Sequence, residues 1–91
     1  MSGLSRTVQI TNRRGLHARA SAKFVTLASS QPCEVQVAKD GSGTVTGTSI
    51  MGLMMLGAAK GDSITISATG DGAEEAVAAL AALVEAKFDE E

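Results

Sequence analysis

Four short segments alternate polar and apolar side chains with a period of two, which sends the apolar side chains to one face of a strand. The predicted strands cover residues 7–11, 34–38, 43–46 and 62–68. The second and third strands are joined across Asp40-Gly41-Ser42, where the Asp-Gly pair favours the positive φ angles of a tight turn. The pattern therefore predicts a central hairpin, with one further strand before it and one after it.

Three other segments carry apolar residues at the spacing of an amphipathic helix. The first helix is expected over residues 18–29. A short second helix over residues 50–56 follows Ser49, whose hydroxyl suits an N-cap. The third helix is expected over residues 73–88, after a turn rich in glycine. The chain thus alternates strands and helices in the order β-α-β-β-α-β-α.

The third helix carries candidate stabilising residues at both ends. Asp71 and Glu74 resemble a capping box, in which two side chains each accept a bond from a backbone N–H of the first turn. Glu74 and Glu75 near its start and Lys87 near its end suit the two ends of the helix dipole. The last residues, 89–91, are expected to fray.

The order of elements predicts an α+β fold. An open-faced β-sandwich, with a four-stranded antiparallel sheet and three helices on one face, would bury the apolar residues of all elements together. The threonine-rich face of the sheet would then face solvent. Because 91 residues, of which 44% are hydrophobic, suffice for one small domain, we expect a single domain over residues 1–91 with an ordered core from about 5 to 88.

Composition and charge exclude several classes of function. The formal charge is −2, and the chain has no Trp or Tyr, so neither phosphate-backbone binding nor base stacking is favoured and no nucleic-acid partner is expected. Cys33 is the only cysteine, which excludes an internal disulfide and a cysteine zinc cage and suggests a small buried hydrophobe. The longest nearly apolar run, residues 50–59, is far shorter than the roughly 20 residues that cross a bilayer. With no secretory signal recognised, we expect a cytoplasmic protein without a membrane partner.

The only histidine, His17, stands where the first predicted helix begins. Helix N-termini present unpaired N–H groups and a positive dipole end, so the backbone of Ala18, Arg19 and Ala20 would face an anion attached to the imidazole. The side chain of Arg19 adds a positive charge, and this environment favours the neutral, nucleophilic ring. A ring in that state can attack a phosphoryl group.

A plainer interpretation is that His17 only caps the helix or lies in solvent, because a lone histidine is a weak signal. Metal binding lacks a second imidazole or thiolate at ligand spacing, and no other histidine can act as the base for a serine nucleophile. An anion site at His17 is the chemical hypothesis that remains. No metal and no cofactor are expected.

Two motifs carry a resemblance to a known family. The segment Asn12-Arg13-Arg14-Gly15-Leu16-His17-Ala18-Arg19 resembles the active-site motif of the HPr family, the histidine phosphocarriers of the bacterial phosphoenolpyruvate-dependent phosphotransferase system. The segment Ser49-Ile50-Met51-Gly52-Leu53-Met54, followed by Leu56-Gly57, resembles the second signature of that family. The spacing between the motifs and the order of elements also agree, so the resemblance covers nearly the whole chain.

The resemblance implies a phosphocarrier, which is a transfer protein and not an enzyme. His17 would accept a phosphoryl group on Nδ1 from phosphorylated enzyme I and pass it to a histidine of an enzyme IIA domain, while Arg19 would hold the phosphoryl oxygens. The family usually has proline where this chain has Ala20. Because proline early in a helix presets φ, alanine is expected to loosen the first turn slightly and to alter rates. The sugar-uptake branch and the nitrogen-related branch, whose carrier is called NPr, both fit the sequence.

Ser49 is a plain helix N-cap by its residue type. The resemblance implies in addition that it is a site of regulatory phosphorylation by an HPr kinase/phosphorylase, although Thr48 stands where the family commonly has lysine. A phosphate there would suit the start of a helix but would disturb an apolar docking surface beside it.

The short apolar helix cannot bury both of its sides. Core filling is the common use of such residues, and helical spacing puts Leu53 and Leu56 together. With the family in mind, we assign these two leucines to the core and the opposite side to a partner-docking patch near His17, where flexible methionines would suit several partners. The predicted patch consists of Ile50, Met51 and Met54.

Two other hypotheses stay open on the sequence alone. The β-α-β-β-α-β order is shared with ferredoxin-like regulatory domains that bind small molecules, and a methionine-rich patch also suits a purely structural adaptor. Both would leave His17 chemically idle. A small carrier that visits several partners in turn is expected to be monomeric.

Overall fold

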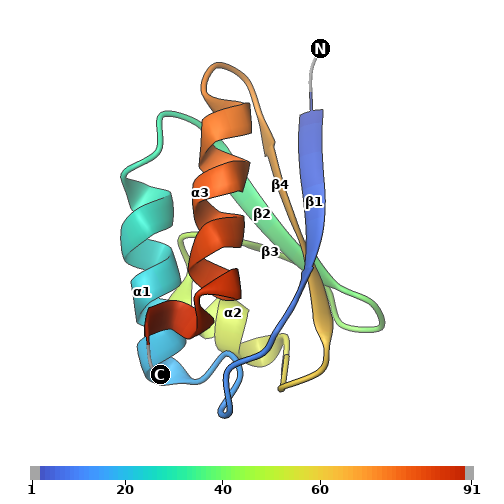
Figure 1. Cartoon of the computed structure of the whole chain (residues 1–91). Coiled ribbons are helices and arrows are strands. Elements are labelled where there is room, and N and C mark those ends of the chain that lie inside the picture. The colour runs from blue at the N-terminus through green and yellow to red at the C-terminus, as the bar shows by residue number, and fades with distance from the viewer. Residues whose placement is uncertain (1–2, 90–91) are drawn as a thin grey trace.

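The computed structural model describes residues 3–89, in which the elements follow the predicted order (Figure 1). The strands are β1 (Gly3–Gln9), β2 (Glu34–Lys39), β3 (Gly43–Thr46) and β4 (Ser63–Thr69). The helices are α1 (Ala18–Ser29), α2 (Ile50–Met55), α3 (Ala73–Glu85) and a final 3-10 turn, η1 (Lys87–Asp89). Within residues 3–89, no helix combines the length and the apolar character that crossing a bilayer requires.

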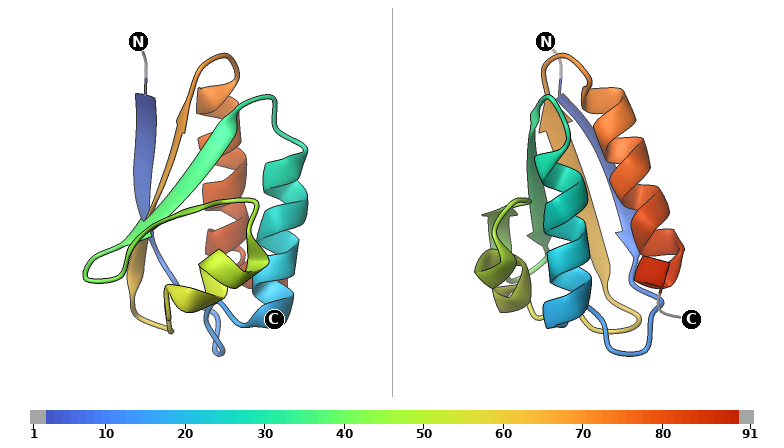
Figure 2. Two further views of the ribbon diagram at one scale, coloured as in Figure 1. Left: turned by 180° about the vertical axis from the view of Figure 1, so that it is seen from behind. Right: turned by 90° about the vertical axis from the view of Figure 1, so that its left-hand side faces the viewer.

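The four strands form one antiparallel sheet in the order β1-β4-β2-β3. The helices lie on one face of this sheet and leave the other face open (Figures 1 and 2). On the open face, the hydroxyls of Thr7 and Thr65 share a hydrogen bond of 2.9 Å between β1 and β4. The predicted open-faced sandwich with a threonine-rich outer face is therefore confirmed.

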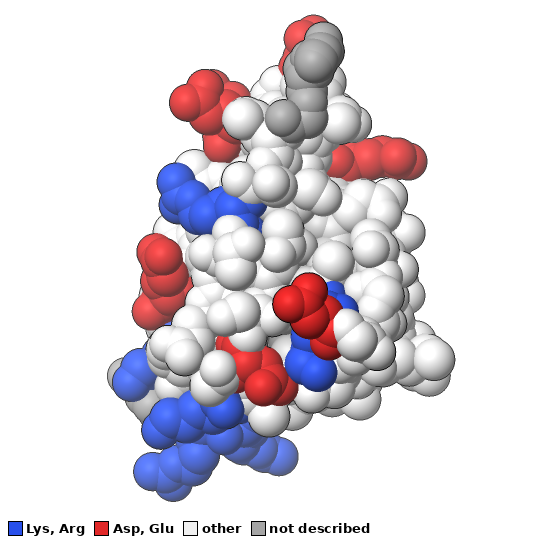
Figure 3. All heavy atoms as spheres, turned by 90° about the vertical axis from the view of Figure 1, so that its right-hand side faces the viewer, with Lys and Arg blue, Asp and Glu red and all other residues white. Residues whose placement is uncertain are grey.

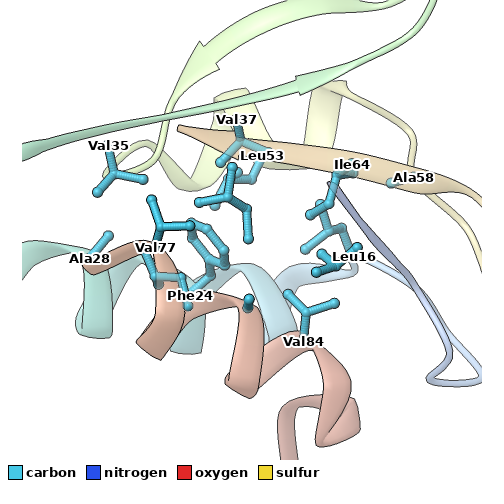
Figure 4. Packing of buried hydrophobic residues seen from close by; sticks show 14 of the residues in the cluster. Leu16, Phe24, Ala28, Val35, Val37, Leu53, Ala58, Ile64, Val77 and Val84 are labelled. Carbon is cyan, nitrogen blue, oxygen red and sulfur yellow. The ribbon is translucent and has the colours of Figure 1, made fainter. Parts of the chain in front are cut away.

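The core lies between the sheet and the helices. Phe24 of α1 and Val77 of α3 point into the same space as Val35 and Val37 of β2 (Figure 4). The alternation that predicted the strands also identifies the buried side chains, since Ile64, Ile66 and Ala68 of β4 are buried between half-buried or exposed polar neighbours. Cys33 is half-buried and packs against the edge of this core, as a small hydrophobe does.

The first strand begins earlier than its hydrophobic pattern predicts. Alternation indicated residues 7–11, but β1 spans Gly3–Gln9 and pairs with β4 along its whole length. Leu4 is 44% exposed, so the start of the strand has no clear buried face to mark it. At Ile10 the chain leaves the ladder and bonds instead to the turn before β4, through Ile10 N to Asp62 O and Gly61 N to Ile10 O, both at 2.8 Å.

The predicted capping box of the last helix is wrong. The N-cap of α3 is Gly72, in the left-handed conformation with φ +84°, and no side chain caps this end. A Cβ at Gly72 would lie 2.5 Å from Cγ of Pro32, so the close approach of this loop requires glycine and shifts Asp71 outside the cap position. Glu74 and Glu75 do lie in the first turn, where they suit the helix dipole.

The C-terminal end of α3 also departs from the prediction. The helix ends at Glu85, so Lys87 does not lie in its last turn, and Phe88 is not part of its apolar stripe. Residues 87–89 have φ values of 59°, 55° and 61°, and this left-handed turn inserts the fully buried Phe88 into the core. Lys23 of α1 donates from Nζ to the carbonyl of Phe88 at 2.7 Å, which helps offset the strain of the turn. Asp89 belongs to η1, and the rest of the segment expected to fray, residues 90–91, lies outside the described residues.

The loop between β1 and α1 is fixed by the turn between α2 and β4. Leu16 N donates to the carbonyl of Ala58 at 2.9 Å. Gly15, with φ +66°, lies directly against the same carbonyl, because a Cβ at this position would lie 2.4 Å from Ala58 O. The loop is therefore held in place before the first helix begins.

Two single variants, Gly15→Ala and Gly57→Ala, distinguish the cost of the close contact with Ala58 from the cost of backbone strain at positive φ. Gly57 has φ +67° and open space around its missing side chain, so Gly57→Ala is expected to lower the free energy of unfolding by about 1 kcal/mol. Gly15→Ala adds a clash with Ala58 and is expected to cost about 1–3 kcal/mol more. Urea unfolding followed by far-UV circular dichroism measures both, and equal losses would show that the contact is not tight.

Candidate functional site

His17 caps the N-terminus of α1. Its backbone is extended, with φ −76° and ψ −178°, and its side-chain Nδ1 accepts the backbone N–H of Arg19 at 3.3 Å. A neutral imidazole that accepts at Nδ1 carries its proton on Nε2. The capping role proposed as the plainer interpretation is thus confirmed, and the same bond turns Nδ1 toward the positive end of the helix.

Ala18, Arg19 and Ala20 form the first turn behind the ring. The N–H groups of the first helical residues have no carbonyl partner within the helix, and together with the dipole they favour an anion. Ala20 is buried at the third helical position, and alanine there keeps an N–H that proline would lack. The turn is regular, since Ser21 N donates to His17 O at 2.9 Å. The predicted backbone donors and the ring therefore lie together.

Asn12 shapes the loop that leads to His17, a role that the sequence analysis did not assign. The side chain is fully buried, and its Nδ2 donates to the carbonyl of Gly15 at 2.9 Å. Gly15 N in turn bonds to Asn12 O at 3.3 Å, which closes a tight turn. The signal was present in the sequence, because asparagine three residues before glycine is typical of turns.

Arg19 places its side chain on the outer surface of the same turn. It is exposed and lines a groove of about 530 Å³ with Leu27 of α1, Leu83 of α3 and Asp89 of η1. The backbone N–H of Arg19 bonds to Nδ1 of His17, whereas its side chain lines this groove. A long cationic side chain in this place can turn toward charge that develops on His17.

Positive charge gathers at the end of the molecule that carries His17. Lys and Arg side chains cluster at the lower end in Figure 3, the end at which Figure 1 shows the loop between β1 and α1. That loop contributes Arg13 and Arg14, both exposed. This end is thus locally basic although the whole chain has a formal charge of −2.

Ser49 caps α2, as its residue type predicts. Its Oγ accepts the backbone N–H of Gly52 at 2.9 Å, and the residue is half-buried. A Cβ at Gly52 would lie 3.1 Å from this oxygen, so the small residue at position 52 leaves room for the bond.

The two sides of α2 divide as the helical spacing predicts. Leu53 and Leu56 are buried, and the opposite side is exposed, with Met51 at 68%. Met55 is 77% exposed and extends this surface beyond the predicted patch, which did not include it. Its spacing of four residues from Met51 is the signal that would have found it. We call the exposed set the α2 patch; it consists of Ile50, Met51, Met54 and Met55.

The α2 patch and His17 lie at the same end of the fold. Helix α2 packs against α1 and lies beside its N-terminal end in both Figure 1 and Figure 2. The turn that follows α2 holds the loop before His17 through the Leu16–Ala58 hydrogen bond. In the part of the chain that the structure describes, no three His, Cys, Asp or Glu side chains cluster as metal ligands would.

Comparisons with known proteins agree with this geometry. A family model described as the PTS HPr component phosphorylation site matches residues 4–86. The phosphocarrier protein HPr of Pseudomonas aeruginosa is 45% identical over 83 residues, which is 91% of this chain and 92% of that protein. The phosphocarrier protein NPr of Escherichia coli K12 is 40% identical over 88 residues, 97% of this chain and 98% of that protein. The crystal structure of HPr-C-His from Thermoanaerobacter tengcongensis shares 45% identity and a TM-score of 0.90, covering 97% of this chain and 98% of that one. The chain therefore belongs to the HPr/NPr family of phosphocarrier proteins of the phosphotransferase system.

Proposed function

We propose that His17 accepts a phosphoryl group on Nδ1 from phosphorylated enzyme I and donates it to a histidine of an enzyme IIA domain. The observation that supports this most directly is the hydrogen bond from Arg19 N to Nδ1 at 3.3 Å. In this bond the Nδ1 lone pair faces an amide of the helix N-terminus, which is the placement that the proposed N–P bond requires. When Nδ1 bonds to phosphorus, the hydrogen bond from Arg19 N–H to Nδ1 is lost, and the phosphoryl oxygens come within reach of that amide and its neighbours.

The transfer step exchanges one nitrogen–phosphorus bond for another. The Nδ1 lone pair attacks phosphorus, the bond from phosphorus to the donor nitrogen breaks, and its electron pair returns to the donor ring. Because the bond formed resembles the bond broken, the group can move on to a second histidine by the same route. One partner adds the phosphoryl group to His17 and another removes it, so the chain is a substrate in both steps and acts as a carrier and not as an enzyme.

The negative charge in transit is matched by groups already in place. The amides of Ala18, Arg19 and Ala20 can donate to the phosphoryl oxygens without any reorganisation of the helix. The Arg19 guanidinium can add a charge-assisted hydrogen bond. These donors stabilise the phosphoryl group for as long as it is bound to His17.

The α2 patch is the surface proposed to dock both partners. A partner histidine must reach within bonding distance of His17, so the docking surface has to adjoin the ring, as α2 does through its packing on α1. The patch is apolar and the loop beside it carries Arg13 and Arg14. Such a surface fits a partner protein whose own surface has an apolar hollow bordered by acidic side chains.

Ser49 is proposed as a regulatory phosphorylation site. A phosphate on Oγ would bring close to two negative charges to the start of α2, where the helix dipole tolerates them. The same charge would stand directly beside Ile50 and Met51, which are exposed and apolar. Phosphorylation at Ser49 is therefore expected to weaken docking while leaving the fold intact.

The relatives include both HPr and NPr proteins, so the proposal covers the sugar-uptake branch and the nitrogen-related branch of the phosphotransferase system alike.

Incubation with phosphoenolpyruvate and a cognate enzyme I, followed by intact mass measurement, tests the central proposal. The unmodified chain is expected to gain one acid-labile phosphoryl group, His17→Ala is expected to gain none, and Arg19→Ala is expected to react about tenfold more slowly because a charged donor is lost. If the unmodified chain gains nothing from an enzyme I that phosphorylates another carrier, the proposal fails. The ligand-binding and adaptor hypotheses would then take its place.

Acidic substitutions test the α2 patch and the serine beside it. Met51→Asp and Ser49→Asp each place a negative charge at the patch, and we expect each to lower the second-order rate of phosphorylation at least tenfold, about 1.4 kcal/mol. Aspartate is itself a good N-cap, so Ser49→Asp should keep its stability. Leu4→Asp is the matched control, because Leu4 is exposed on β1 at the other end of the molecule (Figure 1). Equal rates for all three variants would contradict the docking role of the patch.

A further inference from the structure

Ser21 bonds to both peptide groups that flank His17. Its hydroxyl donates to the carbonyl of Leu16 at 3.3 Å, and its backbone N–H donates to the carbonyl of His17 at 2.9 Å. The first of these carbonyls belongs to the peptide group before the His17 Cα, and the second belongs to the peptide group after it. The orientations of these two groups define φ and ψ of His17, so one residue holds both angles.

The hydroxyl bond is not a usual helical contact. A serine within a helix commonly bonds back to a carbonyl three or four residues earlier, inside its own helix. Ser21 instead reaches five residues back to Leu16, which lies before the N-cap. Ser21 is fully buried and Leu16 is 5% exposed, so solvent is poorly placed to replace the hydroxyl.

The amide side of Leu16 is held as well. Leu16 N donates to Ala58 O at 2.9 Å, so the residue before His17 is bound on both of its backbone groups. The Ala58 contact comes from the turn after α2, whereas the Ser21 contact comes from α1 itself. Only the Ser21 contact is made by a side chain, so a point substitution can remove it.

We propose that Ser21 is a positioning residue for phosphoryl transfer, which holds the His17 backbone so that Nδ1 faces the first turn of α1. This inference rests on the proposed function of His17 as the phosphoryl acceptor. The two hydrogen bonds of Ser21 described above end on backbone carbonyls and not on the reacting nitrogen. Ser21 acts by fixing φ and ψ of His17, which set the direction of the imidazole side chain. Small errors in the direction of a reacting atom lower rates strongly.

The matched control lies at the other end of the same helix. The hydroxyl of Ser30 donates to the carbonyl of Leu27 at 2.7 Å, beyond the last turn of α1 and away from His17. Ser30→Ala removes a serine-to-carbonyl bond from α1, as Ser21→Ala does. Alanine favours the helix and adds no atoms, so Ser21→Ala is expected to fold.

Two measurements test the proposal. In steady-state phosphorylation by enzyme I, Ser21→Ala is expected to lower the maximal rate three- to tenfold and to leave the carrier concentration at half-maximal rate unchanged within twofold, because the α2 patch is intact. In the unphosphorylated protein, amide hydrogen exchange at Arg19 is expected to become at least threefold faster as its bond to Nδ1 loosens. Ser30→Ala is expected to change neither quantity by more than twofold.

Several outcomes would overturn the role of Ser21. A maximal rate within twofold of the unmodified chain would do so, as would an equal loss in Ser30→Ala or an unchanged exchange rate at Arg19. Failure of the proposed function is distinguishable from these outcomes, since the unmodified chain would then accept no phosphate at all. The exchange measurement would still show whether Ser21 holds the His17–Arg19 contact.

Discussion

The hydrogen bond from the Arg19 amide to Nδ1 of His17 is the contact on which the phosphoryl transfer proposed for this chain depends. It places the only histidine at the one point of α1 where unpaired N–H groups and the positive dipole end coincide. It also sets which nitrogen faces those groups. A ring displaced by one residue in either direction would lie inside the helix or in the loop, and would lose this alignment.

Contacts from two loops hold the backbone that leads into α1. The loop from β1 arrives through a turn closed by Asn12 and packs Gly15 onto the carbonyl of Ala58. Ala58 belongs to the turn that follows α2, so one short segment joins the surface proposed for docking to the backbone that leads into His17. The surface proposed for docking and the loop that leads to the ring are thus adjacent parts of the fold, joined by the Leu16–Ala58 hydrogen bond.

Local features of the sequence predict what depends on local physics. The strand and helix periods find the four strands and the three α-helices, the position of His17 predicts a helix cap, and the spacing in α2 separates Leu53 and Leu56 from the exposed methionines. The failures involve contacts between distant segments. Pro32 requires the glycine cap of α3, and Lys23 binds the carbonyl of Phe88 across 65 positions, so no local pattern marks either one. Ser21 was hidden for a different reason: its bond to Leu16 spans only five residues, but no pattern in the sequence marks a helical serine whose hydroxyl bonds outside its own helix.

The most direct test of the account is to identify the ring nitrogen that carries phosphorus. The protein, uniformly labelled with ¹⁵N and phosphorylated by phosphoenolpyruvate and enzyme I, can be examined by long-range proton–nitrogen correlation of the imidazole ring and by proton–nitrogen correlation of the backbone amides. The account predicts that Nδ1 of His17 bears the phosphoryl group and that the amides of Ala18, Arg19 and Ala20 shift on phosphorylation. Phosphorylation at Nε2, with the amides of the first turn unmoved, would contradict it, because the helix N-terminus would then have no part in holding the group.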